Sequence, residues 1–139
     1  MRFKKTSMDF DSEKVITMRR VLVCDDDLTI SEVVAIILTD SRLAEVYTLP
    51  DCDNIIQKIE ALNPSIILMD NKIPSTGGIA ATRVIKNHGV HKNIPVIYFT
   101  GSDDIVSLAE NAGADYMLAK PFTISQLEEV INKAFQSIN

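Results

Sequence analysis

The chain has 139 residues, of which 46% are hydrophobic, and this is enough for one domain with a core that needs no disulfides. Its net charge is −5, and six of its 14 basic residues fall in residues 1–20, which leaves an acidic body unsuited to binding nucleic acid. No apolar run approaches membrane-spanning length and no signal-peptide core is present, so we expect a cytoplasmic protein without a membrane segment.

Residues 1–19 are polar, mixed in charge and without a hydrophobic period. They are predicted to form a flexible tail with a short helix near 12–18, and Met18 is a second candidate for the biological start. From residue 20 onward, apolar runs typical of strands alternate with apolar residues at helical spacing. The ten elements, strand first, are predicted at 21–24, 30–38, 45–48, 55–62, 65–69, 81–88, 95–99, 105–112, 114–119 and 123–138.

The boundaries of these elements carry their own signals. Pro64 ends one helix, and Gly113 is a favourable helix C-cap. Thr123 and Gln126 have the spacing of a capping box, which opens the last helix. Strand–helix alternation with buried apolar strands predicts an α/β fold, a doubly wound five-stranded parallel sheet. The functional crevice of such a sheet lies outside the carboxyl ends of its strands.

Polar residues close four of the predicted strands. They are Asp25, Asp26 and Asp27, then Asp70, Thr100 and Lys120. Because the carboxyl ends of parallel strands share one edge, these residues are expected to form one polar site. Four acids, a hydroxyl and a lysine suit a divalent metal ion and a phosphoryl group.

The acids of this site need a counter-charge. A pair of like charges 4 Å apart costs about 4 kcal/mol at an effective dielectric constant near 20. Oxygen ligands with few carboxylates favour Mg²⁺, and Mn²⁺ also fits. Asp25 and Asp26 are the candidate ligands beside Asp70. For Asp27 the sequence leaves two roles open, a metal ligand or the N-cap of the following helix.

Asp70 is the candidate nucleophile, because a carboxylate can attack a phosphoryl group and form an acyl phosphate. Phosphoryl transfer requires mainly positioning and neutralisation of charge, which the metal and Lys120 can supply. Thr100 offers a hydroxyl to a phosphoryl oxygen. Pro121 can fix the direction of the lysine, and its peptide bond is a candidate for the cis form.

With these residues in this order, the sequence resembles the receiver domain of two-component response regulators over residues 20–139. The motifs that carry the resemblance are Val23-Cys24-Asp25-Asp26-Asp27, Asp70-x-x-x-Pro74-x-x-x-Gly78, Thr100, Gly113-Ala114-Asp115 and Lys120-Pro121-Phe122. The resemblance implies a flavodoxin-like (βα)5 fold with strand order 2-1-3-4-5.

The resemblance also implies roles for the site residues. Asp70 would accept a phosphoryl group from a sensor histidine kinase or a histidine phosphotransfer protein. Asp26 and Asp70 would ligate Mg²⁺ directly, Asp25 through water, and Lys72 through its backbone carbonyl. Lys120 would pair with the phosphoryl oxygens.

A conformational switch follows from the same resemblance. Thr100 would move toward the phosphoryl group and shift the face formed by the fourth helix, fifth strand and fifth helix. The family usually has an aromatic residue three positions before the lysine, but here that residue is Met117. Because methionine is flexible, we expect weaker coupling between phosphorylation and partner binding than in aromatic relatives.

The chain ends soon after the last predicted helix, so we expect a receiver without a fused output domain. It would signal through a downstream protein or through a homodimer on the switch face. It would be a phosphoacceptor that catalyses only its own phosphorylation and dephosphorylation, not an enzyme with a diffusible substrate.

Two alternatives remain open from the sequence. One is a receiver-like interaction module that acts without phosphorylation, for which Met117 is the only indication. The other is a small Mg²⁺-dependent phosphatase in which Asp25 is the nucleophile. That reading rests on Asp25-x-Asp27 after a strand, a pattern similar to haloacid-dehalogenase-type enzymes.

Overall fold

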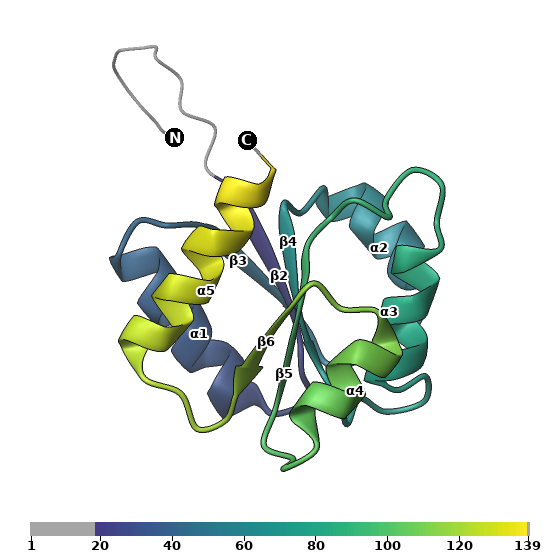
Figure 1. The fold of residues 1–139 in the computed structure, drawn as a ribbon. Helices are drawn as coiled ribbons and strands as arrows, with labels where there is room; N and C mark the ends of the chain where they lie inside the picture. Colours follow the sequence, from purple (N-terminus) through teal and green to yellow (C-terminus); the bar gives the residue numbers. More distant parts are fainter. Residues whose placement is uncertain (1–18, 139) are drawn as a thin grey trace, which may run out of the picture.

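The computed structural model describes residues 19–138, so the predicted tail, the helix near 12–18 and the start at Met18 lie outside the described residues. Strands and helices alternate along the described chain (Figure 1). They are β2 (Arg20–Cys24), α1 (Leu28–Asp40), β3 (Glu45–Leu49), α2 (Ile55–Leu62), β4 (Ile66–Asp70), α3 (Gly78–Lys86), β5 (Val96–Thr100), α4 (Ile105–Ala112), β6 (Tyr116–Ala119) and α5 (Ile124–Ser137).

The described residues form a five-stranded sheet in the order β3-β2-β4-β5-β6. Each pair of neighbouring strands is parallel. In chain order this is second, first, third, fourth and fifth strand, which confirms both the predicted sheet and its strand order. The chain passes from β2 to β3 on one side of β2 and then to β4 on its other side. The acids that follow β2 and β4 therefore lie at the centre of the carboxyl edge.

Helices cover both faces of the sheet, α1 and α5 on one side and α2, α3 and α4 on the other (Figure 1). β4 and β5 are buried along their whole length because helices pack on both of their faces. Two apolar clusters fill the layers, and the apolar side chains of β2, β4 and β5 alternate between them. None of the helices in residues 19–138 is long and apolar enough to cross a lipid bilayer.

Local signals set most element boundaries as predicted. Thr123 and Gln126 form the reciprocal capping box of α5, and Gly113 ends α4 in the left-handed region at φ +81°. The third helix is shorter at its end than predicted, because it stops at Lys86 instead of residue 88. The ring of His88 instead accepts the backbone N–H groups of Val90 and His91 in the following turn.

Candidate functional site

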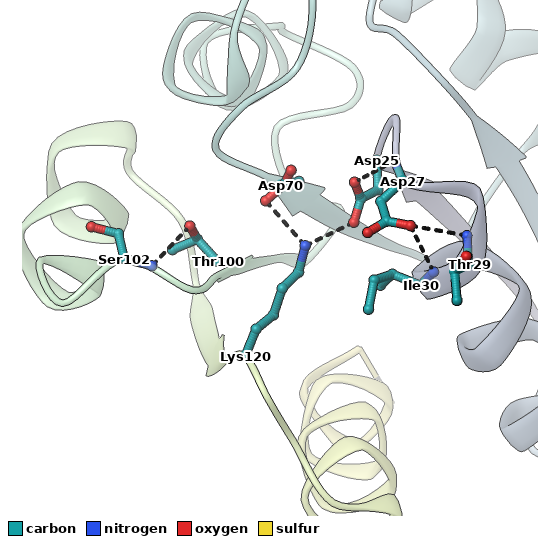
Figure 2. A network of polar contacts seen from close by, with 8 residues as sticks. All are labelled: Asp25, Asp27, Thr29, Ile30, Asp70, Thr100, Ser102 and Lys120. Carbon is teal, nitrogen blue, oxygen red and sulfur yellow. Dashed lines mark hydrogen bonds and ion pairs between the residues drawn. The ribbon is translucent and has the colours of Figure 1, made fainter.

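Four strands deliver polar side chains to the carboxyl edge of the sheet. Asp25 directly follows β2, Asp70 ends β4, Thr100 ends β5 and Lys120 directly follows β6. Figure 2 shows the lysine side chain extending between the two aspartates, with the threonine on the β5 side. The structure therefore brings together the residues that the sequence placed in one site.

Lys120 links the two buried acids. Its ammonium nitrogen is 2.8 Å from Oδ2 of Asp25 and 3.4 Å from Oδ1 of Asp70 (Figure 2). The same nitrogen lies 4.5 Å from the centre of the Phe99 ring, so the ring stabilises the cation by a cation–π interaction. Asp25 is only 1% exposed, so its carboxylate depends on this contact for neutralisation. The Lys120–Pro121 peptide bond is cis, as the sequence allowed.

The site holds more negative than positive charge. Burial raises the pKa of the Asp70 carboxyl, and the nearby charge of Asp25 raises it further, while Lys120 acts in the opposite direction. One carboxylate oxygen from each of Asp25, Asp26 and Asp70 lies within 4.8 Å of the others. This set of hard oxygen donors with surplus negative charge fits a divalent cation of the Mg²⁺ type.

Asp25 and Asp27 contact different groups. Of the two roles that the sequence left open for Asp27, the structure shows the N-cap of α1. The carboxylate of Asp27 accepts the backbone N–H groups of Thr29 at 3.0 Å and Ile30 at 3.3 Å, and so caps α1 (Figure 2). Oδ1 of Asp25 accepts the N–H of Asp27 at 2.9 Å. Both carboxylates therefore have structural partners, whereas Asp26 is exposed to solvent beside them.

Thr100 lies at the edge of the site and is 4% exposed. Its hydroxyl oxygen accepts the backbone N–H of Ser102 at 3.3 Å (Figure 2). The hydroxyl proton remains available for donation, so the residue can bind an oxyanion without giving up its own contact.

Two further polar groups beside Asp70 were missed in the sequence. The hydroxyl of Tyr98 donates to the side-chain oxygen of Asn71, the residue that follows Asp70. Burial and the charge of Asp70 raise the pKa of Tyr98 to about 12, so this hydroxyl stays a donor at neutral pH. The available signal was a tyrosine hydroxyl within the apolar strand β5, two residues before Thr100.

Three other residues singled out in the sequence have side chains that make no hydrogen bond or ion pair with Asp25 or Asp70 among residues 19–138. Lys72 is exposed in the loop after β4, and Met117 is 46% exposed on β6. Asp115 lies at the opposite end of the sheet, where it accepts the N–H of Val96 at 2.9 Å and pairs with Lys86 at 2.5 Å. Its place in the motif is therefore structural.

Comparison with known proteins gives a consistent match. The profile of the family described as "Response regulator receiver domain" matches residues 21–132. The chain is 36% identical over 106 residues to the CAI-1 autoinducer sensor kinase/phosphatase CqsS of Vibrio cholerae, covering 74% of this chain and 15% of that protein. It is 30% identical over 114 residues to the DNA-binding response regulator MtrA of Mycobacterium tuberculosis, covering 80% of this chain and 48% of that protein. The chain thus spans less than half of either relative.

Solved structures share the same fold. The receiver domain of NtrX from Brucella abortus has a TM-score of 0.74 and 29% sequence identity, with 84% of this chain and 98% of that chain covered. The receiver domain of the sensor histidine kinase PA1611 from Pseudomonas aeruginosa has a TM-score of 0.77 and 24% identity, with 86% and 99% covered. The PA1611 structure contains a magnesium ion coordinated in its active-site cleft.

Proposed function

This chain belongs to the response regulator receiver domain family, and we propose that Asp70 is its phosphoacceptor. Receiver domains are phosphoacceptor signalling domains that histidine kinases phosphorylate. The observation that carries the assignment of Asp70 is the bridge of Lys120 between this acid and Asp25. The donor would be a phosphohistidine on a sensor histidine kinase or a histidine phosphotransfer protein.

In the proposed reaction a carboxylate oxygen of Asp70 attacks the phosphorus atom of the donor. The phosphorus–nitrogen bond of the phosphohistidine breaks, its electron pair returns to the imidazole, and an acyl phosphate forms. Lys120, already 3.4 Å from Asp70, would turn its ammonium group toward the new phosphoryl oxygens. Thr100 would donate its hydroxyl proton to one of them. Hydrolysis of the acyl phosphate by water would reset the domain.

Mg²⁺, or Mn²⁺ in its place, would neutralise charge on the transferring phosphoryl group. The proposed ligands are Asp26 and Asp70 directly, the backbone carbonyl of Lys72, and Asp25 through water. The contacts of Asp25 support the indirect role, because its two oxygens already accept from Lys120 at 2.8 Å and from Asp27 at 2.9 Å.

Output would pass through the face of α4, β6 and α5. Three large apolar side chains are exposed there, Val106 at 51%, Met117 at 46% and Ile124 at 59%. Hollows of about 300 and 320 Å³ lie on the two sides of Met117. We assign this face to a cytoplasmic downstream protein or to a second copy of the chain. Thr100 would be the buried switch residue that responds to the phosphoryl group.

The test is intact-mass spectrometry after incubation with Mg²⁺ and a small-molecule phosphodonor. The wild-type chain is expected to gain one phosphoryl group, and neither Asp70→Asn nor a chelated sample is expected to gain any. An Asp25→Asn variant serves as the control for the phosphatase alternative. A well-folded wild-type chain that binds Mg²⁺ but gains no adduct would contradict the proposal and favour the interaction module.

A further inference from the structure

Three sulfur atoms meet on the face of the sheet opposite to α1 and α5. Cys24 at the end of β2 and Met69 in β4 are direct partners across the two parallel strands. Cys52, in the loop between β3 and α2, donates its thiol to Sδ of Met69 at 3.6 Å. Cys52 is also a neighbour of Cys24, because its thiol is the largest cause of the raised pKa of the Cys24 thiol. All three residues belong to one buried apolar cluster, and phosphoryl transfer uses none of them.

We propose that Cys24, Cys52 and Met69 form a binding site for a soft monovalent metal ion, Cu(I). Two thiolates and a thioether are soft donors that select Cu(I) over Mg²⁺, Ca²⁺ or Mn²⁺. One Cu(I) ion bound by two thiolates and a neutral thioether leaves a net charge of −1, so the cation offsets one of the two thiolate charges that the apolar surroundings disfavour. Each thiol that binds the metal releases its proton to solvent, and no change of oxidation state is involved.

The spacing of the sulfur atoms fits such a site. Three sulfurs that each lie about 2.3 Å from a central metal ion are about 4 Å apart. The distance of 3.6 Å between the sulfurs of Cys52 and Met69 is already close to this value. Cys24 and Met69 stand on adjacent, fully buried strand ends, so two of the three donors are held in place by the sheet.

The site also has a route to solvent. Cys52 is 2% exposed, but it lines a surface cavity of about 460 Å³ between α2 and α3. Thr76, Ala81 and Val84 form part of the opposite wall of this cavity. A metal ion delivered from solvent would therefore reach Cys52 first and then the two donors behind it.

The position of the sulfur cluster links it to the acids on the carboxyl edge. Cys24 immediately precedes Asp25, and Met69 immediately precedes Asp70. A bound ion would tie the ends of β2 and β4 together just before both acids. Since the three donors converge only in the folded chain, Cu(I) is also expected to raise the melting temperature.

The test uses the full chain under anaerobic, thiol-free reducing conditions without Mg²⁺, and it does not depend on phosphorylation. Cu(I) is offered as its complex with bicinchoninate, whose colour falls as the protein removes the metal. The wild-type chain is expected to remove about one equivalent, and Cys52→Ala none. Met69→Leu should retain less than the wild type, while the matched control Met117→Leu, at an exposed thioether, should retain as much.

Cys52→Ala is the decisive variant because a small residue at the cavity wall leaves the strands intact. Circular dichroism and thermal unfolding check that each variant is folded. The proposal is overturned if the folded wild-type chain leaves the Cu(I) with the chelator, or if Cys52→Ala removes as much as the wild type. Equal retention of Zn²⁺ under the same conditions would overturn the assignment to a soft monovalent ion.

Discussion

β4 and β6 both deliver a functional residue to the site, but they do so from opposite environments. β4 lies between β2 and β5, is buried at every position and ends on Asp70. β6 is an edge strand, alternates between exposed and covered positions and leads into Lys120. The reacting group is therefore fixed at the centre of the fold, while its cationic partner comes from the strand that carries Met117. In the proposed switch, phosphorylation of Asp70 at the centre would move the surface at the edge.

The largest expected effect on this contrast comes from Gly78, whose backbone packs against the end of β4. An added Cβ at Gly78 would lie 2.1 Å from the backbone oxygen of Asp70 and 3.0 Å from Cα of Asn71. Gly78→Ala is expected to lower the free energy of unfolding by about 3 kcal/mol, because backbone atoms cannot yield. Urea unfolding measures this effect.

The matched variant is at Gly101, which directly follows β5 and lies beside Lys120. A Cβ at Gly101 would meet its nearest neighbour, the Lys120 side chain, at 3.9 Å, which is an ordinary contact. Gly101→Ala is expected to change the free energy of unfolding by no more than about 0.5 kcal/mol. Equal losses in the two variants would show that the backbone beside the end of β4 is not more tightly constrained than the loop after β5.

The second test removes the link between edge and centre. Lys120→Ala is expected to slow phosphorylation by a small donor on the order of a hundredfold, because the charge on the phosphoryl oxygens loses its cation. The control is Lys133→Ala, whose side chain is 61% exposed and pairs with Glu129 at 3.6 Å. Stopped-flow or mass-spectrometric rates that are alike for the two variants would contradict the proposed role of Lys120.

The third test uses pH. Because burial and Asp25 raise the pKa of Asp70, ionising Asp70 costs more in the folded than in the unfolded chain. Asp70→Asn should therefore raise the melting temperature in Mg²⁺-free buffer, and the gain should grow as pH rises from below the usual range for aspartate through the raised pKa. A gain that shrinks over this rise in pH would contradict the sign of the pKa shift.

The smallest expected effect concerns the edge strand itself. Met117→Tyr should strengthen the coupling between phosphorylation and the α4–β6–α5 face by about fivefold, at the low end of allosteric coupling energies. The measurement is the phosphorylation-dependent change in populations seen by NMR at Val106 and Ile124, with Met117→Leu as the control. An unchanged response in Met117→Tyr would refute the idea that methionine loosens the switch.

The contrast between the strands also explains what the sequence could reveal. Uniform apolar runs such as Ser65–Met69 and helical spacing were enough to predict the alternation of elements and the parallel sheet. Asp70, Thr100 and Lys120 were found because each stands where an apolar run ends. Parallel topology then requires them to share one edge.

Other contacts depend on packing between segments that are distant in the chain. The hydroxyl of Tyr98 reaches Asn71 only because β5 lies beside β4 in one register. The approach of Cys52 to Met69 depends on how the loop after β3 folds over β4. The role of Asp27 was undecided because a carboxylate after a strand can serve either a metal or a helix start.

The central claim, that Asp70 alone among the acids becomes phosphorylated, is tested most directly by trapping the acyl phosphate. Borohydride reduces a phosphorylated aspartate to homoserine, and mass spectrometry of the resulting peptides locates the change. After treatment with Mg²⁺ and a phosphodonor, homoserine is predicted at position 70 only. Homoserine at position 25 or 26, or none in a chain that carries the phosphoryl group, would contradict the account.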